Sequence, residues 1–200
     1  MKRGVLLFVL LGFLSVPAGA QRLHVGLEWG ATGSVYTHHD HQYTTLDGYH
    51  IDRHYYDTAF WTNGYVSLQA AWAFSRRFHL ALCTGYQGIQ TGIRSIPLSL
   101  RATVYPGPDL NHRGVLWYLE GGSGFSEDKL KHNADFVRLG GGYRIPLGTG
   151  VRLKLLASFQ GSICQPMPYD DYDEVFVDES HLEYSYRTAL AVSLGMALEW

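Results

Sequence analysis

The sequence predicts an all-β protein, an eight-stranded antiparallel transmembrane β-barrel with short periplasmic turns and longer extracellular loops. Three observations predict it: an N-terminal segment typical of export, apolar residues at every second position, and connections that alternate between short and long. In each alternating segment, large apolar residues occupy one face, while Gly, Ala, Ser and a few charges occupy the other. A membrane barrel has this pattern, because one face of each strand meets lipid and the other meets a narrow interior.

Residues 1–20 have the pattern of a signal peptide. Lys2 and Arg3 precede an apolar stretch that is too short to span a membrane as a helix, and the segment ends in Ala-Gly-Ala at residues 18–20. We therefore expect residues 21–200 to form one barrel domain, located in the cell outer membrane after secretion.

Strict alternation identifies the strands, most clearly in the last one. There Leu194 and Met196 share one face, and Ser193 and Gly195 share the other. The eight segments with this pattern are residues 23–30, 65–74, 78–86, 95–104, 115–120, 136–145, 151–160 and 189–200.

The connections are expected to lie at two different ends of the barrel. The predicted periplasmic turns are residues 75–77, 106–113 and 147–150, and the predicted extracellular loops are residues 36–62, 88–94, 126–134 and 162–180. Short turns at one end and longer loops at the other are typical of such barrels. A ten-stranded barrel would need two more strands from the first or last loop.

Composition excludes several classes of protein. The formal net charge of -2 argues against a nucleic-acid binder, and two cysteines cannot build a disulfide framework. Aromatic residues make up 14% of the chain, which is too many for a disordered protein of low net charge. No cofactor is expected.

A set of charged residues has the inward phase on the predicted strands. An eight-stranded barrel is just wide enough for side chains to fill it, and unpaired charges there would be costly. We therefore predict a plugged interior with a network of paired charges, although interior waters could solvate the same groups. The predicted network consists of Glu28, Arg101, Glu120, Arg138 and Arg187.

Two loops carry candidate ligands for metal ions. The first loop is rich in histidine and aspartate, and imidazole binds zinc or copper. The alternative for this loop is a polar, pH-responsive surface. The last loop is acidic and could bind divalent cations that bridge lipopolysaccharide, or could be merely a solvated loop. The candidate metal ligands are His38, His39, His41, Asp52 and His54.

Three motifs resemble the small outer-membrane β-barrel proteins, particularly the porin-like or PorT-like barrels of Gram-negative bacteria. They are the C-terminal Leu198-Glu199-Trp200, the Ile-Pro strand at residues 95–100, and the Tyr-Leu-Glu-Gly-Gly strand at residues 117–122. The resemblance implies an outer-membrane location and assembly by the barrel-assembly machinery. It implies no activity, because one fold serves many functions.

The expected function is that of a non-enzymatic barrel, structural or acting in surface interactions through its extracellular loops. Its expected partners are outer-membrane lipid, lipopolysaccharide, the assembly machinery and an extracellular ligand of unknown identity. The alternatives are a metal- or envelope-ligand-binding barrel, using the His-rich first loop and the acidic last loop, and an outer-leaflet hydrolase.

Overall fold

The computed structural model describes most of the chain beyond the expected signal peptide. The described residues are 23–58, 61–90, 93–107, 113–126, 133–148, 150–170, 175–178 and 180–200. The predicted signal peptide, residues 1–20, lies outside them. In the described part of the chain, no helix is long and apolar enough to cross a membrane.

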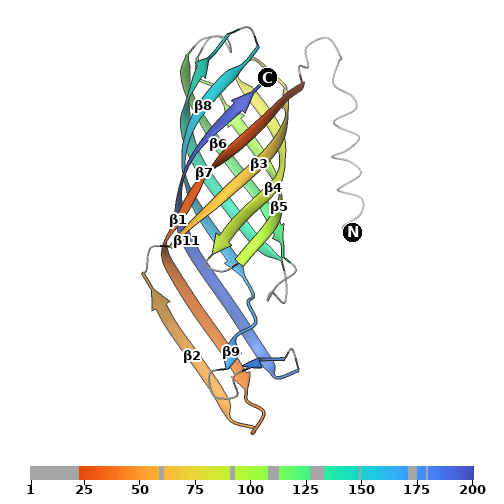
Figure 1. Ribbon diagram of the computed structural model, residues 1–200, viewed down its shortest axis with the longest axis vertical. Coiled ribbons are helices and arrows are strands. Elements are labelled where there is room, and N and C mark those ends of the chain that lie inside the picture. Colours follow the sequence, from red (N-terminus) through yellow and green to blue (C-terminus); the bar gives the residue numbers. More distant parts are fainter. Residues whose placement is uncertain are drawn as a thin grey trace.

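Eight strands form a closed antiparallel barrel (Figure 1). Each barrel strand pairs with the next one along the chain, and pairing of the last strand with the first closes the barrel. The predicted fold class and strand number are therefore confirmed. The barrel strands are β1 (Leu23–Thr44), β3 (Trp61–Ala73), β4 (Phe78–Gln90), β5 (Ile93–Val104), β6 (Gly114–Phe125), β7 (Ala134–Pro146), β8 (Arg152–Cys164) and β11 (Leu182–Glu199).

The two faces of each strand have the orientation that the alternation predicts. On β11, Leu194 is 65% exposed on the outside, whereas the neighbouring Ser193 is 2% exposed and faces the lumen. On β7, Val137 and Leu139 are exposed, whereas Arg138 between them is buried. A continuous belt of exposed Leu, Val and aromatic side chains is stable only in an apolar medium. The outer wall is therefore that of a barrel embedded in a lipid bilayer.

The prediction that residues 36–62 form a loop is wrong for most of that segment. β1 continues beyond the barrel to Thr44, and β2 (His50–Asp57) returns antiparallel beside it. The residues of β11 that precede the barrel wall pair with the other side of β1, down to the pair Tyr43 and Leu182. We call this three-stranded sheet of β1, β2 and β11, seen below the barrel in Figure 1, the extension.

β2 also shows why the barrel has eight strands rather than ten. It pairs with β1 only over Thr37–Thr44, whereas β3 pairs with the barrel part of β1 over Leu23–Ser34. A register shift between Ser34 and Tyr36, where Val35 is the additional residue, marks the point at which β1 leaves the barrel. The extra strand therefore lengthens one side of the molecule and does not widen the wall.

Other loops differ from the prediction as well. β4 and β5 continue until only residues 91 and 92 separate them, so residues 88–94 contain almost no loop. The last loop contains two short strands, β9 (Tyr169–Asp170) and β10 (Val175–Phe176), which pair with each other. Of the loop predicted at residues 126–134, residues 127–132 lie outside the described part.

Glycine is required where the ring of Tyr65 crosses the lumen. A methyl group on Gly195 would overlap the Tyr65 hydroxyl, which donates a hydrogen bond to Oε1 of Glu28 at 3.0 Å. Gly30 leaves room for the same ring, because a Cβ at this position would lie only 2.8 Å from Cε1 of Tyr65. The two glycines therefore leave the space that the ring occupies.

We predict that Gly195→Ala lowers the unfolding free energy by about 1–3 kcal/mol, the usual range for overpacking. The loss should be smaller in a Tyr65→Phe background, where the hydroxyl is gone. Urea unfolding in detergent, followed by tryptophan fluorescence, measures both. Gly161→Ala is the control, since its methyl group would only touch Leu190 at 3.8 Å. Equal losses in the two backgrounds would show that the hydroxyl is not the obstacle.

Candidate functional site

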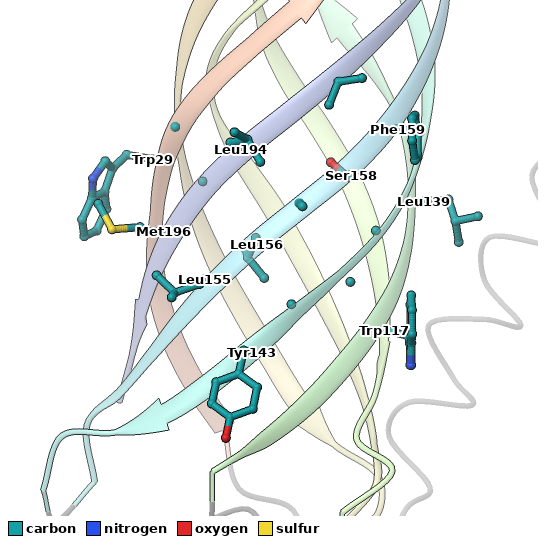
Figure 2. A pocket seen from close by; sticks show the side chains of 17 residues that line it. Trp29, Trp117, Leu139, Tyr143, Leu155, Leu156, Ser158, Phe159, Leu194 and Met196 are labelled. Atoms are coloured by element: carbon teal, nitrogen blue, oxygen red, sulfur yellow. The ribbon is translucent and has the colours of Figure 1, made fainter.

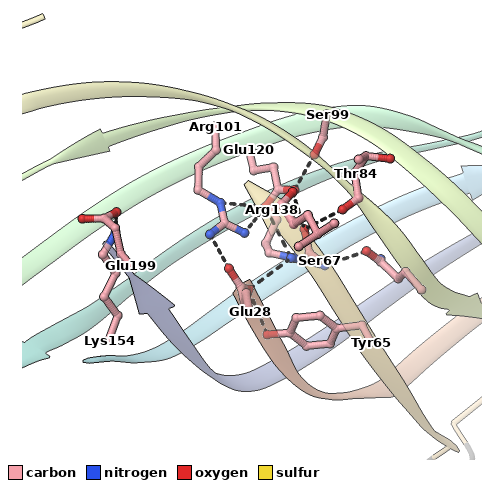
Figure 3. Close-up of polar contacts among 12 residues, drawn as sticks. Glu28, Tyr65, Ser67, Thr84, Ser99, Arg101, Glu120, Arg138, Lys154 and Glu199 are labelled. Carbon is pink, nitrogen blue, oxygen red and sulfur yellow. Dashed lines mark hydrogen bonds and ion pairs between the residues drawn. The ribbon is translucent and has the colours of Figure 1, made fainter. Parts of the chain in front are cut away.

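A carboxylate and guanidinium network fills the middle of the lumen (Figure 3). Arg101 on β5 binds Glu28 on β1 through Nη1 at 2.5 Å, and Glu120 on β6 through Nη2 at 2.7 Å. Glu120 also accepts a hydrogen bond from Ser99 at 2.6 Å. All four side chains are buried, so Arg101 links two carboxylates that reach it from separate parts of the barrel wall.

Arg138 on β7 extends this network to the other side of the lumen. Its Nη1 lies 3.3 Å from Oε2 of Glu120, and its Nη2 donates to the side-chain carbonyls of Gln87 at 3.0 Å and Gln160 at 2.8 Å. Its guanidinium also lies over the ring of Tyr65, 5.2 Å from the centroid. The four charged residues cancel in sign, and each has several polar partners, so the network can stay buried without a net charge.

A second charged cluster lies at the end of the lumen that carries the short turns. Glu199 binds Arg152 at 3.1 Å and also contacts Lys154. Arg144 and Lys154 both lie over the ring of Tyr105, at 4.7 and 5.6 Å from its centroid. The alternation of the strands gives these residues the inward phase, so the sequence does indicate that their side chains face the lumen.

Arg187 does not belong to the predicted interior network. It pairs with Cys164, the last residue of β8, and its Nε donates to Nδ1 of His39 at 3.0 Å. Its phase is inward, as predicted, but its height places it at the end of the barrel wall, where the extension begins. The network also has uncharged members, which a search for charged residues does not find: Tyr65, Gln87, Ser99 and Gln160.

The five candidate metal ligands do not converge on one point. Because side chains alternate along a strand, His39 and His41 lie on the buried face of β1 and His38 on the opposite face. Asp52 and His54 share the face of His38, since they pair with Gln42 and Asp40 of β1. The prediction of one site that includes His39 and His41 is therefore wrong in its geometry.

On the buried face, the histidines are held by stacking and hydrogen bonds. The ring of His39 stacks on Tyr55 with centroids 4.3 Å apart. Nδ1 of His41 lies 2.8 Å from the hydroxyl of Ser185. Burial, followed by the charge of Arg187, lowers the pKa of both histidines to about 4.

These pKa values predict that acid opens the extension. The free imidazole titrates near pH 6.5 and the folded one near pH 4. Between these values the opened strands bind protons that the folded ones do not, so the stability present above pH 6.5 falls as the pH drops toward 4. Hydrogen exchange of the β1 amides at residues 37–43, corrected for intrinsic rates, should report the opening. A His39→Gln, His41→Gln double variant should respond less to pH, and an unchanged pH response would contradict this origin.

On the opposite face, Asp40 joins two of the predicted ligands. Nδ1 of His54 lies 2.9 Å from Oδ1 of Asp40, and Nε2 lies 2.9 Å from Oδ1 of Asp52. One ligand atom from each of the three residues lies within 4.8 Å of the other two. His50 and Glu183, 3.2 Å apart, form a separate pair.

The outer wall carries an apolar groove of about 1050 Å³, centred on β7 and β8 (Figure 2). The small residues Gly141 and Ala157, which are paired in the sheet, form its floor. Trp117, Phe159 and Leu194 stand around it. In the bilayer this groove faces acyl chains, which match its apolar lining.

No protein-family model and no curated protein sequence matches this chain. Among solved structures, the outer membrane protein OprG from Pseudomonas aeruginosa superposes with a TM-score of 0.55 and 11% identity, covering 91% of this chain and 98% of OprG. The outer membrane protein AlkL gives a TM-score of 0.45 at 11% identity, covering 93% of this chain and 94% of AlkL.

Together, the closed barrel, its apolar belt and its likeness to OprG confirm the resemblance at the level of the fold. The fold of this chain is that of the small eight-stranded outer-membrane β-barrels.

Proposed function

We propose that this chain is a non-enzymatic outer-membrane barrel with a closed lumen that acts at the cell surface through its extension. The observation that carries the proposal is the extension itself. It continues the barrel sheet beyond the wall and presents an edge strand, β2, at the end opposite the short turns.

The extension and the neighbouring last loop expose many apolar groups outside the lipid belt. A cluster of exposed apolar side chains on a water-facing surface is typical of an interaction site. Tyrosine suits such a site, because its ring is apolar and its hydroxyl stays hydrated. The exposed residues are Leu46, Tyr49, Tyr55, Tyr56, Tyr169, Val175, Phe176 and Tyr186.

The lumen supports a role without solute passage. Two layers of paired charges cross it, one at Arg101 and Arg138 and one at Glu199, and their side chains are buried. A solute would have to break these ion pairs to pass, and each broken buried pair costs several kcal/mol. The proposed partners are therefore outside the lumen: lipid along the wall, lipopolysaccharide at the extracellular rim, the barrel-assembly machinery during biogenesis and an extracellular ligand.

We expect the purified barrel to show no stable single-channel conductance in planar bilayers at neutral pH. The charged layers should hold the lumen shut under these conditions, since their ion pairs stay intact. Insertion is verified by heat-modifiable gel mobility of the same sample. Discrete, reproducible openings of the inserted protein would contradict a closed lumen.

A shortened variant tests the surface role. Replacing residues 40–54 by a four-residue turn removes the end of the extension and leaves the barrel wall intact. If the protein acts through the extension, cells that make this variant should share the envelope defects of cells lacking the protein, at equal amounts of folded barrel. Full complementation by the shortened barrel would place the role elsewhere.

A further inference from the structure

We propose that Asp40, Asp52 and His54 form a binding site for a divalent transition-metal ion on the outer face of the extension. The proposal does not depend on whether the lumen is closed. It rests on three ligand side chains that two paired strands bring together.

The strand register places the three residues. Asp40 of β1 lies directly opposite His54 of β2, and the next pair on the same face is Gln42 and Asp52. Directly opposite and diagonal residues on one face of a sheet lie within reach of each other. His54 therefore stands between two carboxylates, one across the ladder and one two residues earlier on its own strand.

His54 contacts a carboxylate through each of its two ring nitrogens. Both ring nitrogens lie 2.9 Å from a carboxylate oxygen. Oδ1 of Asp40 is shielded from solvent and accepts no hydrogen bond, although Nδ1 of His54 is this close. A neutral imidazole carries one N–H, so one of its two neighbours then faces a lone pair. The lone pair of that ring nitrogen and the carboxylate oxygen repel each other. A metal ion bound to both atoms would replace this repulsion by coordination.

The ligand set selects the class of ion. One imidazole and two carboxylates suit Zn²⁺, Cu²⁺ or Ni²⁺, whereas Ca²⁺ and Mg²⁺ prefer a shell of oxygen atoms. Asp40 also receives a hydrogen bond from Tyr184 on β11, the type of contact that orients a metal-binding carboxylate. With three protein ligands, water completes the coordination.

A metal ion here would hold β2 against β1. β2 is the edge strand of the extension, and among the described strands it pairs only with β1. The two carboxylates lie at different ring nitrogens of His54, so the ring must turn, and the strands keep the three side chains close enough for this. One ion would then join Asp40 of one strand to Asp52 and His54 of the other. We therefore expect metal binding to protect the β2 amides, at residues 50–57, from hydrogen exchange.

The test is isothermal titration of the full-length refolded barrel with Zn²⁺, on a chain without a polyhistidine tag. The wild type should bind one ion per chain. His54→Ala and Asp52→Asn should each weaken binding about tenfold or more, as expected for changes at or beside a metal ligand. Asp52→Asn keeps the shape of the side chain, and heat-modifiable mobility verifies that each variant is folded.

His38→Ala is the matched control. His38 lies on the same face of β1, but its ring stacks on Tyr56 at 4.5 Å and not on the cluster. This variant should bind as the wild type does. Three outcomes would overturn the proposal. They are no binding of Zn²⁺ to the wild type, wild-type affinity in His54→Ala, and loss of binding in a His39→Gln, His41→Gln variant but in none of the others. Co²⁺ gives a second readout, because its visible absorption should shift and change in intensity when protein ligands replace water, and His54→Ala should lack this change.

Discussion

Replacing Glu120 with alanine should lower the unfolding free energy of the barrel by about 3–5 kcal/mol, the range for removing one member of a buried charge pair. Glu120 accepts from both Arg101 and Arg138, at 2.7 and 3.3 Å. Without it, two guanidinium groups remain in the lumen with Glu28 as the carboxylate they share. The loss is therefore mainly the cost of leaving positive charge buried and incompletely paired.

The measurement is reversible urea unfolding of the barrel in lipid vesicles, followed by tryptophan fluorescence. Glu183→Ala is the control, because the contact of Glu183 with His50 is half-exposed and such pairs contribute at most about 1 kcal/mol. A combined Arg101→Met, Glu120→Met variant should recover part of the loss, since it removes charges of both signs together. A loss below about 1 kcal/mol in Glu120→Ala would mean that water already solvates the network.

The sequence predicts which side chains enter the lumen, but not which ones meet. Period two assigns the inward phase of Glu28, Arg101, Glu120 and Arg138, and the structure buries all four. The contact between Glu28 and Arg101 joins residues 73 positions apart on strands that are not neighbours. It exists only because the barrel closes. Arg187 shows the complementary limit, since phase gives the face of a strand and not the height at which the barrel wall ends.

The extension could not be predicted from alternation for a physical reason. In the lipid belt one face must be apolar, so a strand shows a clear period of two. Beyond the belt both faces of β1 and β2 carry polar or aromatic groups, such as His38, His39, Asp40 and His41. Without contrast between the faces, the pattern disappears although the strands continue. The candidate metal ligands lie in this segment, so their division between two faces was not visible in the sequence either.

Leu139→Arg should destabilise the barrel by about 2–4 kcal/mol, the range for a cation on the lipid face near the middle of the bilayer. Leu139 lies near the middle of β7, is 60% exposed and borders the apolar groove of the outer wall (Figure 2). In water such a substitution on an exposed residue would change the unfolding free energy by about 0.5 kcal/mol or less. The unfolding free energy, measured by urea unfolding in vesicles, shows whether Leu139 faces lipid or water.

Leu46→Arg is the matched control, because it makes the same chemical change at a position that is at least as exposed. Leu46 is 68% exposed, in the turn between β1 and β2 at the tip of the extension, away from the lipid belt. Its replacement should therefore have little effect on the unfolding free energy. Because the chemical change is the same, the difference between the two losses of unfolding free energy reports whether each leucine is surrounded by lipid or by water. If both variants were equally stable, the Leu, Val and aromatic belt would not be in contact with acyl chains, and the assignment of the outer wall to the membrane would fail.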